Sequence, residues 1–197
     1  MTGLVKKVVR WFSNSPTETN AEEQRGKCSI SALKGWTGKA TARIVFDSMV
    51  DEFTCDGLFQ MVKGKPNIAV IGFTTEGDVF GGFYGVAVTK QGWWFKDPNL
   101  FVFSFESHGR CETPQRFAVK KGLENAYVYF CRKDSYGFVL FLVSGGFFLG
   151  NERSDSDCEN MSLAFEGLED TTLTGENSPN GEGPFHHCAR IVAIHLG

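Results

Sequence analysis

The sequence has no run of about 20 apolar residues, which is the length a helix needs to cross a membrane. The basic N-terminus is not followed by the long apolar core and small-residue cleavage site of a secretory signal. Glycine stands at position 3 and not at position 2, so the myristoylation pattern is also missing. We therefore expect no transmembrane segment, and a location in the cytoplasm or the nucleus.

The common catalytic motifs are missing as well: there is no G-x-S-x-G, P-loop, H-E-x-x-H or C-x-x-C pair. His186, His187 and Cys188 form the densest group of metal-ligand types, but the second ligand pair of a zinc site is missing. A His108–Cys111 dyad would lack a third group to orient it. We expect no enzyme activity, no bound metal and no cofactor.

A net charge of −3 gives no overall attraction to nucleic acid, so DNA binding would need a local basic face. Two groups of basic residues are candidates for phosphate contacts: Lys6, Lys7 and Arg10 near the N-terminus, and Arg116, Lys120 and Lys121 in the second half of the chain. A solvated basic face is the more common explanation of such groups.

Six cysteines are widely spaced, and without a secretory signal we favour free thiols over disulfides. Cys131 is the candidate redox thiol, because Arg132 and Lys133 follow it and a cationic neighbourhood favours the reactive thiolate.

Short apolar runs rich in phenylalanine (19 Phe) alternate with glycine-containing turns (23 Gly), which is typical of many strands and few helices. Strands are expected at residues 43–46, 100–105, 126–131, 138–143, 144–150, 161–165 and 190–196. The one clear helix begins after Thr54 as N-cap, carries apolar residues at 55, 58, 59 and 62, and stops at Gly64. These elements predict a mainly β fold with a few short helices (α+β), built as two packed antiparallel sheets.

Residues 67–88 read as a β-hairpin whose turn is Thr74 to Asp78. Its second strand contains Gly81 and Gly82, where a strand usually has side chains, and this indicates a bulge or a close approach of two backbones. Glu76 and Asp78 flank the turn, where acidic residues serve turn geometry alone.

Residues 1–39 are expected to form an N-terminal tail before a domain at 40–197. Apolar residues at 4, 5, 8, 9 and 12 predict a short amphipathic helix with Lys6, Lys7 and Arg10 on its other side. That helix would bind a partner groove or a membrane surface, or would dock on its own domain, which we favour. Residues 13–27 read as a polar linker and 31–39 as an ordered loop.

Residues 89–99 read as a loop that contains three adjacent aromatic residues, Trp93, Trp94 and Phe95. Adjacent aromatic residues can form an exposed patch that binds a partner. The more frequent arrangement buries at least one of them, because neighbours in an extended chain point to opposite sides.

The order of three segments resembles the TLDc domain: residues 42–48 (ARIVFDS), a short helix followed by 64–67 (GKPN), and residues 73–83 (FTTEGDVFGGF). The strand at 101–105, the glycine-led strand at 144–146 and the closing strand at 190–196 are also similar, so the resemblance covers residues 40–197. It implies a domain of two antiparallel sheets, a role in protection against oxidative stress, and no established active site. Several relatives bind the vacuolar proton pump, and others act with nuclear transcription factors.

Three functions follow as hypotheses. The first is a non-enzymatic stress-protection domain that binds a protein assembly such as the vacuolar proton pump. The second is a DNA-binding or transcription-associated regulator of the peroxide response. The third is a weak peroxide-reactive thiol protein that uses Cys131.

Overall fold

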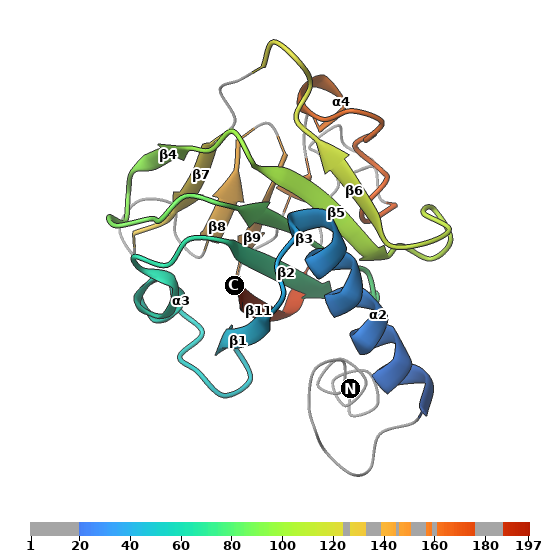
Figure 1. Ribbon diagram of the computed structural model, residues 1–197, viewed down its shortest axis with the longest axis horizontal. Helices are drawn as coiled ribbons and strands as arrows, with labels where there is room; N and C mark the ends of the chain where they lie inside the picture. Colours follow the sequence, from blue (N-terminus) through green and yellow to red (C-terminus); the bar gives the residue numbers. More distant parts are fainter. Residues whose placement is uncertain are drawn as a thin grey trace.

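Two antiparallel sheets form the body of the protein (Figure 1). The computed structural model describes residues 20–123, 127–132, 139–144, 146–150, 157–158, 161–175 and 187–197. Sheet A has the order β1 (Ala42–Asp47), β11 (Cys188–Leu196), β2 (Ile68–Thr74), β3 (Val79–Tyr84), β5 (Phe101–Glu106) and β6 (Gln115–Ala118). Sheet B has the order β10 (Asp157–Cys158), β9 (Phe147–Gly150), β8 (Val139–Val143), β7 (Tyr127–Phe130) and β4 (Trp94–Lys96). The predicted fold class is confirmed.

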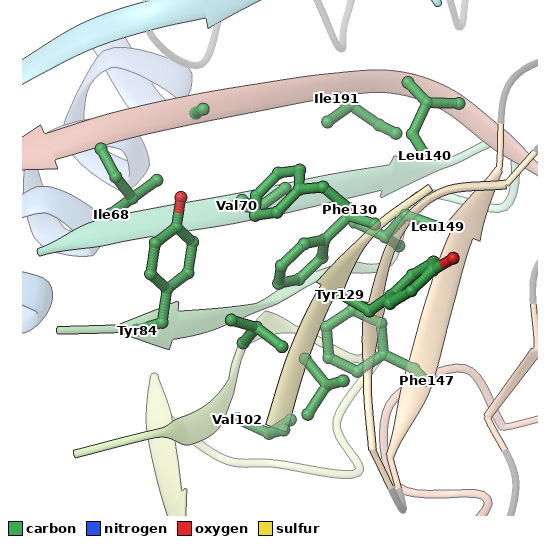
Figure 2. Close-up of a cluster of buried hydrophobic side chains, with 14 of the residues drawn as sticks. Ile68, Val70, Tyr84, Val102, Tyr129, Phe130, Leu140, Phe147, Leu149 and Ile191 are labelled. Atoms are coloured by element: carbon green, nitrogen blue, oxygen red, sulfur yellow. The ribbon is translucent and has the colours of Figure 1, made fainter. Parts of the chain in front are cut away.

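The main core lies between the two sheets and is rich in aromatic rings. Figure 2 shows Val70 and Tyr84 of sheet A facing Phe130 and Phe147 of sheet B. The rings of Tyr84 and Phe130 are 5.7 Å apart and meet edge to face, the geometry that aromatic quadrupoles prefer. Because successive residues along a strand point to opposite faces of its sheet, every second side chain of these strands points into this core.

Helix α2 (Asn20–Thr37) covers the outer face of sheet A and closes a second apolar cluster. Its Leu33 is fully buried, and the ring of Trp36 lies about 6 Å from those of Phe101, Phe103 and Phe105. The predictions of a linker continuing to residue 27 and of a loop at 31–39 are therefore wrong over the helix. The local sequence pattern does not predict this helix, because Gly26 and Gly35 lower its helix propensity. Packing on the sheet supplies the stability instead. The predicted helix at 4–12 lies outside the described residues.

Helix α3 (Cys55–Val62) confirms its prediction in detail. The Thr54 hydroxyl accepts a hydrogen bond of 3.0 Å from the Gly57 N–H, which caps the first turn. The predicted apolar stripe, Cys55, Leu58, Phe59 and Val62, is buried. Gly64 follows the helix at φ +72°, in the left-handed region that glycine accepts most easily.

The predicted hairpin of β2 and β3 is also confirmed. Its glycines allow atoms of neighbouring strands to lie close to the backbone of β3. A Cβ at Gly81 would overlap the carbonyl oxygen of Val70 and would lie 2.8 Å from the Phe103 ring. A Cβ at Gly82 would lie 3.0 Å from Val143 of the opposite sheet. Glycine at these positions lets β3 pack tightly against its neighbours.

Strand β11 confirms the predicted closing strand and lies in the middle of sheet A, between β1 and β2. Arg190 of β11 is 2 % exposed, and its Nε donates a hydrogen bond of 2.8 Å to Asp47 Oδ1, while Nη2 donates to Oδ2. The guanidinium also lies 5.5 Å from the Phe73 ring centre. This bidentate pair fixes the register between the first and last strands of the domain.

Four short elements differ from the sequence predictions, and one of them is the two-residue strand β10, which was not expected. Residues 161–165 do not form a strand: α4 (Met161–Ala164) is a helical turn, and the buried Met161 and Phe165 are four residues apart as a helix requires. The predicted loop at 89–99 contains β4, and β6 was not expected at all. In the segment after α4, Leu173 and Thr174 are buried; residues 176–186 lie outside the described part.

Replacing Gly81 by Ala tests the close approach inside the hairpin. Because the new methyl group meets backbone, which cannot rotate away, we expect a loss of about 3 kcal/mol in the free energy of unfolding. Gly35→Ala is the matched control: it has open space around its Cβ and lies inside α2, so it should stabilise the protein by up to about 1 kcal/mol. Urea unfolding of both variants measures the difference, and equal stabilities would contradict the packing argument.

Candidate interaction site

Trp93 and Trp94 are both exposed, with 57 % and 41 % of their surfaces accessible. They lie at the start of β4, which is the edge strand of sheet B. The ammonium group of Lys90 lies 4.7 Å from the Trp93 ring centre. We call Lys90, Trp93 and Trp94 the tryptophan edge. Both tryptophan rings are accessible, whereas Phe95, the third adjacent aromatic, is half-buried and packs against the main core. That the two tryptophans bind a partner stays a prediction.

The tryptophan edge continues into the outer face of sheet B. The strand register places Trp94 opposite Tyr129, Tyr129 opposite Leu142, and Leu142 opposite Phe148. The Trp94 and Tyr129 ring centres are 4.7 Å apart. Tyr129 is buried, and Leu142 and Phe148 are half-buried and pack against the main core, so this row supports Trp94 by packing.

Polar side chains hold both ends of this segment, the half-buried Gln91 before β4 and the buried Asp97 after it. Before β4, the Gln91 side chain donates hydrogen bonds to the carbonyl oxygens of Cys55 (3.1 Å) and Cys131 (3.2 Å). After β4, the carboxylate of Asp97, 1 % exposed, accepts hydrogen bonds from the backbone N–H groups of Gly85 and Asn99, among others. The exposed rings are thus presented on an anchored segment. Neither anchor was foreseen, and the Asp-Pro-Asn sequence after β4 was the available signal for the second.

A second apolar surface lies at the other sheet's edge strand, β1. A groove of about 540 Å³ is lined there by Ile44, Val50 and Met61, which are 37 %, 82 % and 39 % exposed, and by polar residues. Sequence reasoning missed this surface, because its members come from β1, the loop after it, and α3. The local signal was Met49–Val50, an apolar pair in a loop between Asp47 and Asp51.

Two of the basic candidates, Arg116 and Lys120, make contacts within the protein. Arg116 Nη1 donates a hydrogen bond of 3.1 Å to the Trp36 carbonyl, and its guanidinium lies 5.3 Å from the Phe101 ring centre. Lys120 Nζ donates a hydrogen bond of 2.5 Å to the Ser162 carbonyl, whereas Lys121 is exposed. Lys6, Lys7 and Arg10 lie outside the described residues.

Cys131, the candidate redox thiol, is fully buried. Burial, and to a smaller extent the neighbouring Cys55, raise the pKa of this thiol to about 12. Desolvation therefore outweighs any effect of the basic residues that follow in sequence, and almost no thiolate is present at neutral pH. Cys55, Cys111, Cys131 and Cys188 are all free thiols.

Asp78, expected to serve turn geometry only, is a buried carboxylate that joins three segments. It is 2 % exposed, and its Oδ1 lies 2.5 Å from Arg110 Nη2 and 2.9 Å from His108 Nδ1. The same Nη2 of Arg110 donates a hydrogen bond of 2.8 Å to the Leu173 carbonyl. His108 is thus oriented by Asp78, a partner that the imagined His108–Cys111 dyad did not include.

Within the described ranges, no three His, Cys, Asp or Glu side chains are grouped as a metal site would require. A search of the same residues finds no helix with the length and hydropathy to cross a membrane.

The described geometry defines a two-sheet β-sandwich domain with exposed apolar side chains at its edge strands. The family model of the TLDc domain matches residues 27–172, so the chain belongs to the TLDc family, which is linked to oxidative stress. The match begins inside α2 and ends before β11. A search of curated proteins gave no match.

Alkylation of the native protein by iodoacetamide tests the thiol environments. Half-buried Cys111 should react about tenfold or more faster than buried Cys131, which reacts only when the core opens. Peptide mapping by mass spectrometry gives each rate separately. Equal rates for the two thiols in folded protein would contradict the buried environment of Cys131.

Asp78→Asn tests the buried junction of the three segments. The amide leaves Arg110 without its charged partner, so we expect the free energy of unfolding to fall by about 3 kcal/mol. Glu76→Gln removes an exposed acid from the same turn and should change it by less than about 0.5 kcal/mol. Thermal unfolding measures both, and an unperturbed Asp78→Asn protein would refute the role of the junction.

Proposed function

We propose that this TLDc protein acts in the oxidative-stress response without catalysing a reaction, by binding a protein assembly through the tryptophan edge. The vacuolar proton pump is the partner we propose, because the TLDc resemblance implies it for several relatives. The observation that most directly supports this proposal is the pair of adjacent, accessible tryptophans on an edge strand.

The energetics of tryptophan support a protein partner. Each indole buries a large area on binding, and tryptophan is enriched among the residues that dominate protein interfaces. Two such rings left in water form an apolar surface that a partner stabilises by covering it.

The anchoring of β4 supports the same proposal. Gln91 and Asp97 hold the chain on both sides of the rings, so little conformational entropy remains to be lost on binding. Lys90 beside Trp93 adds a positive charge at the rim, which favours an acidic partner surface. The groove at β1 is a second surface of the same kind, at the edge strand of the other sheet.

The double variant Trp93→Ala, Trp94→Ala tests the proposal against purified vacuolar proton pump in biolayer interferometry. We expect the affinity to fall by about tenfold or more, as for other central tryptophans. Leu163→Ala is the matched control, because Leu163 is 67 % exposed and α4 lies away from β4 (Figure 1). Its affinity should equal that of the unmodified protein.

Two outcomes would contradict the proposal at different points. If the unmodified protein shows no binding to the pump at micromolar concentration, the pump is not the partner. If it binds and the double variant binds equally well, the tryptophan edge is not the contact surface.

A further inference from the structure

A cavity of about 450 Å³ lies between the end of α2 and strands β3, β5 and β6. Its volume falls in the range of small-molecule sites. Phe83, Leu100 and Phe101 form its apolar part, and the carbonyl end of α2 contributes Trp36 and Thr37. None of the residues of the tryptophan edge lines it, so the cavity is a separate feature of the molecule.

The charged residues that line the cavity are both positive: Lys39 and Arg116. Among the residues that the structure describes, no carboxylate lines the cavity, although the whole chain carries a net charge of −3. The nearby acid, Asp97, lies behind Gly85 and Asn99, and its oxygens accept backbone N–H groups from Gly85, Val86 and Asn99. These bonds hold that carboxylate in the wall and disperse its charge, so the cations dominate inside the cavity.

Arg116 is held in place before any ligand arrives. Its guanidinium lies over the ring of Phe101, and Nη1 donates to the Trp36 carbonyl, which offsets the partial negative charge at the end of α2. A guanidinium has five N–H donors, and this hydrogen bond uses one of them. The side-chain amides of Asn67 and Asn99 add further donors around the cavity.

We propose that this cavity binds a small organic anion whose charged group is attached to a planar ring. Arg116 and Lys39 take the anionic group by charge-assisted hydrogen bonds. The ring lies against the apolar wall beside Phe101, and Asn99 hydrogen-bonds the polar substituents. The site needs no bound protein partner. Whether it binds an anion does not depend on whether the proposed function is correct.

A ¹H–¹⁵N NMR titration with 1-naphthyl phosphate tests the site, because that probe joins an aromatic ring to a dianion. We expect saturable shifts of the backbone amides of Gly85, Asn99 and Ala118, with a Kd of about 1 mM or lower for a ligand of this size. The neutral 1-naphthol should bind about tenfold more weakly, because it lacks the charge that the cations recognise.

Variants separate charge recognition from folding. Arg116→Gln should raise the Kd of 1-naphthyl phosphate about tenfold, and Arg116→Lys should restore most of the loss by returning the charge. Lys39→Gln, at an exposed residue, should raise it about threefold without affecting the fold. Lys121→Gln is the matched control, because Lys121 is exposed and does not line the cavity, and its Kd should not change.

Four results would overturn the proposal. The first is no saturable shift at these amides, and the second is equal binding of 1-naphthol. The third is a Lys121→Gln Kd that rises as much as that of Lys39→Gln. Saturable shifts with inorganic phosphate of the same Kd would also overturn it, because the ring would then contribute nothing.

Discussion

The position of β11 is the constraint on which the rest of the structure depends. This last strand lies between β1 and β2, so sheet A is continuous only when the end of the chain is in place. Each of its faces then supplies side chains to one of the two apolar clusters: Ile191 and Ala193 to the core between the sheets, Val192 and Ile194 to the cluster under α2. Such long-range pairing makes folding slow compared with local hairpins, because the loop must close before the contacts form.

The buried pair of Arg190 and Asp47 makes this arrangement specific. Its desolvation cost roughly cancels its Coulomb attraction, so the pair contributes little net stability. A shifted register of β1 on β11 would instead leave a buried guanidinium without its carboxylate, which costs several kcal/mol. The ion pair therefore selects one register among those that the apolar residues alone would allow.

The elements that could be predicted are those whose signals are local. The Thr54 cap and the apolar stripe identify α3, and the two runs around Thr74 to Asp78 identify the hairpin. Helix α2 could not be found this way, because its stability comes from Leu33 and Trp36 packing on strands far along the chain. Edge strand β6 has exposed Gln115 and Arg116, so it lacks the apolar pattern of an interior strand.

The candidate sites on the surface divide in the same way, into those with a local signal in the sequence and those without one. Adjacent tryptophans are visible in a sequence, although their exposure is not, because it depends on β4 lying at the edge of sheet B. The groove at β1 and the cavity beside Arg116 each combine residues from several elements, and so does the junction at Asp78. No single stretch of sequence contains these sites, so they could be recognised only once the chain was folded.

A rigid sandwich with apolar residues displayed at its edge strands is well suited to hold a partner in one orientation. Hydrogen–deuterium exchange, with and without the vacuolar proton pump as the proposed partner, measures directly which surface becomes covered. The account predicts slower exchange in residues 90–96, which contain the tryptophan edge, and unchanged exchange in α4. Protection confined to α4 or to other surfaces, with residues 90–96 unchanged, would contradict it.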